Sequence, residues 1–227
     1  MPKKHLALFF AIFFISTLAF ASSATILGGS INYTSRTMEI DIAYPVLIDG
    51  TNKKAIQKIN NTIKRDIDNF YNYFLEYRKH YIPKGRPGFQ GNVSYVIEMN
   101  EKDLLSLTIT YYEYTGGAHG ISEQIGYTFE LSSGNRLFLK DLFKTDYPYN
   151  DILKEQVVQE IVQNSSDYFQ DAKDHVLEND FSFGSFYLKP NNLVVYFGVY
   201  DIAPYYLGSP EFIIPKEILS EGLIIDF

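Results

Sequence analysis

The sequence predicts an α+β fold in which antiparallel sheets carry a long helix and a second helix on one face. Three observations support this prediction. Nineteen Tyr and eighteen Phe among 227 residues favour strands. Residues 51–80 repeat apolar side chains at steps of three and four, which is the spacing of an amphipathic helix. The strand-like segments after this helix are separated by hairpin-length turns, which indicate antiparallel pairing.

Two strands and the long helix are expected first. Residues 30–34 and 37–44 favour strands, and apolar residues alternate with polar ones in the second. Residues 45–50, which begin with Pro and end with Gly, are expected to end this strand. The stripe on the helix at residues 51–80 is typical of packing on a sheet, with a partner-binding helix as the alternative. Its members are Ile56, Ile59, Ile63, Ile67, Phe70, Phe74 and Tyr77.

Further strands follow a loop at residues 83–91, which is rich in Gly and Pro. Alternating patterns and polar turns predict strands at residues 92–99, 104–114 and 122–131, and a short continuation of the sheet at 137–139.

The last part of the chain combines helices with strands. A second apolar stripe predicts a helix over residues 149–164, and residues 167–178 are also expected to be helical. Strands are expected at residues 183–188, 193–200 and 211–214, and a short final helix at 215–222.

Residues 1–21 are interpreted as a secretory signal peptide. Lys3 and Lys4 precede an apolar run of about 15 residues that ends in Ala19-Phe20-Ala21, a small-x-small cleavage site. The run is short for a membrane span, which needs about 20 residues. We therefore expect a secreted or periplasmic protein, attached to a membrane only if this segment is retained as an anchor. The rest is expected to form two α+β lobes, residues 22–145 and 146–227, packed as one unit.

Composition excludes several classes of function. The net charge of −7 without a basic stripe argues against nucleic-acid binding. The absence of Cys excludes disulfides, cysteine nucleophiles and thiolate zinc sites. No Gly-rich phosphate motif is present, and no pair of His has metal-ligand spacing. The sequence therefore predicts no cofactor and no metal site.

One candidate binding loop follows a strand rich in Tyr. Glycines permit positive φ and close backbone approach, and exposed N–H groups of such a loop can hold an anion or a carbonyl. Its His is also a candidate general acid or base, although a catalytic His needs a nucleophile or a metal beside it. The alternative is a tight turn with no ligand. The loop comprises Thr115, Gly116, Gly117, Ala118, His119 and Gly120.

A second candidate loop lies at residues 200–210. Pro204 restricts its own φ and the conformation of Ala203, so the loop should be stiff and display Tyr205 and Tyr206. Rigid Tyr in a preorganised loop is typical of a binding hot spot. The alternative is that these tyrosines close the edge of the core.

These loops and their surroundings resemble one family, the extracytoplasmic domain of RsiV-type anti-sigma factors and of the N-terminal regions of some peptidoglycan deacetylases. The similar blocks are residues 105–120 with the Thr-Gly-Gly-Ala-His loop, residues 127–143, residues 186–215 with Ala203-Pro204-Tyr205, and Ala43-Tyr44-Pro45 with Ile59-Asn60. The resemblance covers most of residues 37–219.

The resemblance implies an α+β domain outside the membrane. In the anti-sigma members this domain recognises animal-type lysozyme, and by position the loop at residues 115–120 and Pro204, Tyr205 and Tyr206 would face the partner. Five residues precede the apolar segment, and the chain ends soon after the last similar block. We therefore expect neither a sigma-binding domain nor a deacetylase domain.

Three hypotheses for function follow. The first is a stand-alone, non-catalytic binding module at the cell envelope, with a lysozyme-like protein or a cell-wall glycan as its ligand. The second is an envelope hydrolase that uses His119 with a carboxylate, although no carboxylate pair is singled out by its spacing. The third is a structural envelope protein.

Overall fold

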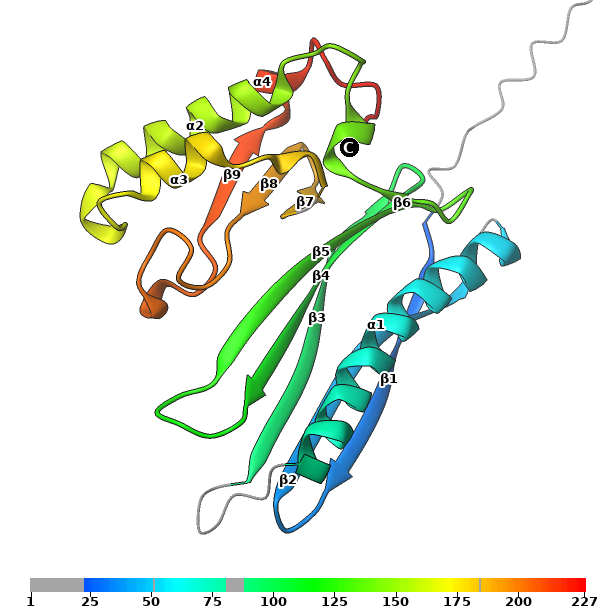
Figure 1. The fold of residues 1–227 in the computed structure, drawn as a ribbon. Helices are drawn as coiled ribbons and strands as arrows, with labels where there is room; N and C mark the ends of the chain where they lie inside the picture. The colour runs from blue at the N-terminus through cyan, green and yellow to red at the C-terminus, as the bar shows by residue number, and fades with distance from the viewer. Residues whose placement is uncertain (1–22, 51, 81–87, 184) are drawn as a thin grey trace, which may run out of the picture.

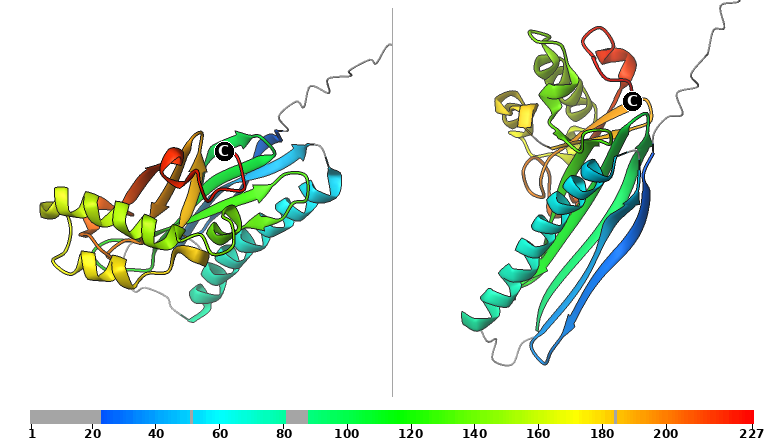
Figure 2. Two further views of the ribbon diagram at one scale, coloured as in Figure 1. Left: turned by 90° about the horizontal axis from the view of Figure 1, so that it is seen from above. Right: turned by 90° about the vertical axis from the view of Figure 1, so that its right-hand side faces the viewer.

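The computed structural model describes residues 23–50, 52–80, 88–183 and 185–227. The predicted signal peptide lies outside the described residues. The described chain is an α+β fold, as predicted, with a large and a small sheet that each carry helices (Figures 1 and 2). No helix in these residues is long and apolar enough to span a membrane.

The large sheet has six strands in the order of the sequence. They are β1 (Thr25–Thr34), β2 (Met38–Asp49), β3 (Phe89–Glu101), β4 (Leu104–Tyr114), β5 (Ile121–Glu130) and β6 (Arg136–Leu137). All neighbours pair antiparallel except β2 and β3. This parallel pair departs from the expectation, because the long helix α1 (Lys53–His80) connects the two strands and returns the chain to the same end of the sheet.

Two boundaries predicted from Pro and Gly were wrong. β2 continues through Pro45 to Asp49, because β3 pairs only with Met38–Ile42 of β2 and Pro45 lies opposite Gly28 of the edge strand β1. β3 already begins at Phe89 and includes Gly91, where an added Cβ would lie 3.1 Å from the Phe74 ring of α1. Glycine is present there because the helix packs closely on the strand, and it does not mark a loop.

Strand β4 separates two packing layers. Leu105, Leu107 and Ile109 pack with the apolar stripe of α1 in one core. Alternate residues of a strand point to opposite faces, so Leu104 and Ser106 face away from α1. Leu104 belongs to a second core with the helices and strands of the small sheet. The middle of the large sheet is therefore covered on both faces.

The small sheet contains β7 (Phe186–Lys189), β8 (Asn192–Tyr196) and β9 (Glu211–Pro215), all antiparallel. Helices α2 (Tyr149–Gln163) and α3 (Ala172–Glu178) pack on it, and the short α4 (Lys216–Leu219) follows β9. The predicted strand over residues 193–200 was too long: β8 ends at Tyr196, and the chain then turns, with a φ of 72° at Tyr200. The second core also takes residues from β3 and β4, and the division into lobes at residue 146 stays a prediction.

Buried polar groups join the two sheets. The backbone N–H of Leu188 donates to Ser106 Oγ at 2.8 Å, and Ser106 Oγ lies 3.1 Å from Thr128 Oγ1. A Cβ added at Gly126 would collide with the carbonyl oxygen of Phe186, so β7 packs directly on the backbone of β5. We call this contact the sheet junction. It holds the unpaired edge of β7 on the face of the large sheet opposite α1.

We predict that Ser106→Ala lowers the free energy of unfolding by about 1–3 kcal/mol, because the buried Leu188 N–H loses its acceptor. Urea denaturation followed by circular dichroism measures this change. Ser94→Ala, at an exposed position of β3, is the matched control and should change stability by less than about 0.5 kcal/mol. Equal effects of the two substitutions would contradict the proposed importance of the sheet junction.

Candidate functional site

The first predicted loop connects β4 to β5. Gly116 and Gly117 have φ values of 107° and 116° with no atoms near an added Cβ, so conformation rather than space requires glycine. At Gly120 the requirement is space, because a Cβ there would collide with the Tyr112 ring. Tyr114 Oη donates to the carbonyl of Gly117 at 3.0 Å and closes the turn. Gly117, Ala118 and His119 are exposed.

The second predicted loop follows β8. Ile202 and Ala203 are fully buried and anchor it, and the carbonyl of Ile202 accepts a hydrogen bond from the Phe169 N–H. Pro204 then precedes a single 3-10 turn at Tyr205–Leu207. Tyr206 is 73% exposed at the tip of this turn. The loop is therefore anchored at its base and displays an aromatic ring to solvent, as the sequence predicted for a stiff loop.

The structure brings the two loops into contact. Tyr205 Oη donates to the carbonyl of Gly120 at 2.9 Å across 85 residues of sequence. The rings of His119 and Tyr205 lie 4.3 Å apart between centroids, and Tyr200 lies 5.5 Å from Tyr205. The Gly120 carbonyl also lies 2.9 Å from His119 Nδ1, which must donate because a carbonyl only accepts. We call this arrangement the paired loops.

The paired loops contain all the residues predicted as a binding site. Some of these residues form the contact between the loops, and the others form the turns that lead to it. His119, Gly120 and Tyr205 form the contact, and Tyr206 projects beside it. Thr115, Gly116, Gly117 and Ala118 form the turn before His119, and Pro204 leads into the turn of Tyr205 and Tyr206. That these residues bind a ligand stays a prediction.

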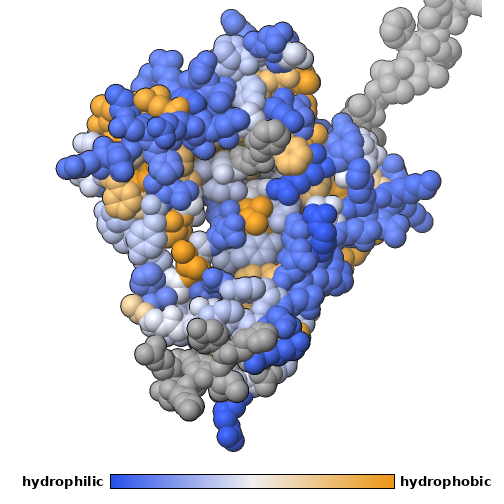
Figure 3. Space-filling model, in the orientation of Figure 1, coloured by the Kyte–Doolittle hydropathy of each residue, from blue (hydrophilic) through white to orange (hydrophobic). Residues whose placement is uncertain are grey.

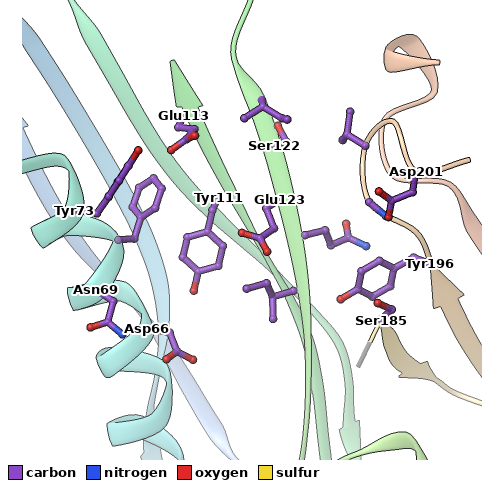
Figure 4. Close-up of a pocket in the computed structure, with 16 residues that line it drawn as sticks. Asp66, Asn69, Tyr73, Tyr111, Glu113, Ser122, Glu123, Ser185, Tyr196 and Asp201 are labelled. Atoms are coloured by element: carbon purple, nitrogen blue, oxygen red, sulfur yellow. The ribbon is translucent and has the colours of Figure 1, made fainter. Parts of the chain in front are cut away.

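A groove of about 780 Å³ begins next to the paired loops. It extends along β5, between α1 on one side and, on the other, Tyr196 at the end of β8 with residues 198–201 after it (Figure 4). A hollow is also visible on this face of the space-filling view (Figure 3). Sequence reasoning missed the groove, because its lining comes from α1, β4, β5 and residues 185–201 around β7 and β8, which only the fold brings together.

The groove is acidic and aromatic. Asp66, Glu113, Glu123 and Asp201 contribute carboxylates, whereas no Lys or Arg belongs to its lining among the described residues. Burial, and then the charge of Glu123, raises the pKa of Glu113 above its ordinary value.

Tyrosines connect the walls of the groove. Tyr127 Oη donates to Asp66 Oδ2 at 3.1 Å and lies 3.4 Å from Tyr111 Oη, which links α1 to the sheet. On the other wall, Tyr196 Oη accepts the Gly126 N–H at 2.7 Å. Burial raises the pKa of Tyr111 and of Tyr196 to about 12, so both are neutral hydrogen-bonding groups near neutral pH.

The geometry around His119 gives the hydrolase hypothesis no support. Within the described chain, the interactions of His119 are with the Gly120 carbonyl and with the rings of Tyr200 and Tyr205, and none is with a carboxylate. No group of three His, Cys, Asp or Glu among these residues lies close enough to hold a metal ion.

Comparison with known proteins finds matches to two family models. Residues 31–122 match the family described as "Deacetylase PdaC", and residues 140–217 match "Protein of unknown function (DUF3298)". These two matches and the curated relatives below agree with the family of RsiV-type and PdaC N-terminal domains. This confirms the resemblance noted from the loops and their surroundings.

Two curated relatives come from Bacillus subtilis (strain 168). The chain is 25% identical over 190 residues to peptidoglycan-N-acetylmuramic acid deacetylase PdaC, a match that covers 83% of this chain and 39% of PdaC. It is 26% identical over 192 residues to anti-sigma-V factor RsiV, a match that covers 82% of this chain and 65% of RsiV. The chain thus spans less than two thirds of either relative.

Solved structures share the fold. A DUF3298 family protein from Bacteroides fragilis has a TM-score of 0.66 at 21% identity, over 90% of this chain and 95% of that one. Another, from Pseudomonas aeruginosa, has a TM-score of 0.62 at 15% identity, over 90% of this chain and 94% of that one. The α+β arrangement of this RsiV-like, PdaC-related chain is therefore that of DUF3298 structures.

We predict that Glu113→Gln stabilises the protein at about pH 7 and has little effect at about pH 3. The folded-state pKa of Glu113 is raised, so as pH rises the unfolded state loses this proton first and the folded state loses stability. Gln removes that cost only where Glu would be ionised. Urea denaturation at both pH values measures the difference, with the exposed Glu39→Gln of β2 as control. A Glu113→Gln effect that is the same at both pH values would contradict the assignment.

Proposed function

We propose that this protein is a non-catalytic binding module of the bacterial cell envelope. It acts in a secreted or periplasmic location and recognises a lysozyme-like protein or a cell-wall glycan through the paired loops. The observation that carries this proposal is the contact between His119, Gly120 and Tyr205, which joins two loops from distant parts of the sequence. A surface held in one conformation before binding loses less entropy on complex formation.

The chemistry of the paired loops fits recognition of a protein. Tyr206 is 73% exposed beside a base of buried residues and backbone hydrogen bonds, so its ring offers a large contact area at a low entropic cost. The similarity to anti-sigma-V factor RsiV supports the lysozyme-like partner, which the family resemblance implies for this loop pair. This is the alternative we favour.

A cell-wall glycan is the second candidate ligand. The similarity to a peptidoglycan-N-acetylmuramic acid deacetylase supports it, and exposed Tyr200 and Tyr206 offer ring faces to a sugar. A glycan would need hydrogen-bonding groups near these rings, and the exposed Gly117–His119 backbone of the first loop is available for that role.

We predict that the purified protein binds immobilised animal-type lysozyme with micromolar or tighter affinity, and that Tyr206→Ala weakens binding roughly 30-fold. This factor corresponds to the ~2 kcal/mol typical of an aromatic hot spot. Surface plasmon resonance measures both. Leu27→Ala removes a side chain that is 55% exposed on β1, far from the loops in sequence, and should bind as the unmodified protein does.

Lysozyme binding that is absent up to about 100 μM, weaker than roughly −5.5 kcal/mol, would refute the protein partner. Soluble peptidoglycan fragments are then tested on the same proteins. Fragment binding that is lost in Tyr206→Ala would support the glycan, and failure of both ligands would refute the proposal.

A further inference from the structure

The outer edge of β5 is largely unpaired. β6 pairs only with Thr128 and Phe129 of β5. On the other side, β4 pairs with β5 from Ile121 to Glu130. Within the described chain, residues 121–125 of β5 therefore have a strand on one side only. The unpaired stretch is about 16 Å long at roughly 3.3 Å per residue.

The backbone groups of this edge point into the groove. Gly126 donates its N–H to Tyr196 Oη, and its carbonyl accepts from Arg136 Nη2 at 2.9 Å, so both groups point away from β4. In an antiparallel pair this orientation recurs every second residue. The N–H and C=O groups of Gln124 and Ser122 therefore also point outward, and none of the described backbone hydrogen bonds outside the strands reaches them.

The groove has a wall on each face of this edge. On the side of α1, it is lined by Asp66, Asn69 and Tyr73 of the helix and by Glu113 and Glu123 of the sheet. On the side of the small sheet, it is lined by Ser185, Tyr196, Gly198, Val199 and Asp201. Figure 4 shows Glu123 on β5, with Asp66 and Tyr73 of α1 on one side and Tyr196 and Asp201 on the other. An unpaired strand edge between two walls has the shape of a site for one added strand.

The charges of the walls determine which strand fits. Glu113 and Glu123 take part in none of the described ion pairs. Asp66, which pairs with Arg65 at 3.1 Å, and Asp201, whose Oδ2 accepts the Gly198 N–H, add a carboxylate on each side. An added strand directs alternate side chains to alternate walls. Lys or Arg side chains would meet carboxylates there, whereas acidic side chains would be repelled.

We propose that this groove binds an extended, basic segment of a partner polypeptide, which adds to the edge of β5 as a further strand. Hydrogen bonds to the backbone of Ser122 and Gln124 hold the segment, and the carboxylates of the walls select its basic side chains. The site lies beside the paired loops and does not depend on them, so it stands whether or not the loops bind lysozyme or a glycan.

The test uses a short blocked peptide of alternating Lys and Thr, labelled for fluorescence anisotropy, with the purified protein. We expect saturable binding that weakens as salt is added, and no binding of the matching Glu and Thr peptide. Two further peptides carry methyl groups on backbone nitrogens, one at every Lys and the other at every Thr. In an added strand only every second N–H faces β5, so one methylated peptide should lose binding and the other should keep it within about twofold.

Protein variants provide the second arm of the test. Glu113→Gln with Glu123→Gln should weaken peptide binding about tenfold. Glu39→Gln with Glu217→Gln makes the same change in net charge at exposed positions outside the groove and should have no effect. Tyr206→Ala should leave peptide binding unchanged, which distinguishes this site from the paired loops.

Three outcomes would overturn the proposal. The first is no saturable binding of the basic peptide. The second is an equal effect of the two N-methylation patterns, which would indicate charge attraction without strand pairing. The third is that the protein binds chitotetraose, that the Glu113→Gln, Glu123→Gln variant loses this binding, and that the peptide does not compete with chitotetraose. This result would assign the groove to a glycan.

Discussion

The arrangement of this protein depends on the sheet junction, where β7 lies on the backbone of β5 and its Leu188 N–H donates to the Ser106 side chain of β4. Ser106, Thr128 and the Leu188 N–H form a fully buried set of hydrogen bonds there. Gly126 allows β7 to approach the large sheet at backbone distance. A buried polar group without a partner costs free energy, so these bonds also oppose sliding of one sheet over the other.

Both candidate sites follow from this junction. Because β7 is held on β5, the loop after β8 lies at the end of the β4–β5 hairpin, and Tyr205 reaches Gly120. The same placement puts Tyr196 and Asp201 along one side of β5 while α1 covers the other. β6 is too short to cover the edge of β5 between these walls, so a groove remains.

Sequence periodicity predicted helices and strands correctly where the residues of one element are sufficient to determine its structure. The apolar stripe predicted α1 because a single helix presents that face to one sheet. Polar turns predicted the antiparallel pairs of β3, β4 and β5 because their connections are short. The two loops were recognisable because Gly permits the positive φ values at Gly116 and Gly117, whereas the ring of Pro204 restricts its φ. Errors arose where packing overrides local preference, as at Pro45, at Gly91 and in the parallel pair of β2 and β3.

The sequence by itself determined the α+β class, most of the elements and the residues of the paired loops, since these depend on the chemistry of neighbours in the chain. Only the tertiary structure decided that the loops touch and that β5 keeps an open edge between carboxylates from four segments. Asp66 and Asp201 are far apart in the sequence, and their shared groove results from the packing of α1 and the small sheet on opposite faces of one strand. Long-range packing of this kind has no local pattern from which it could be read.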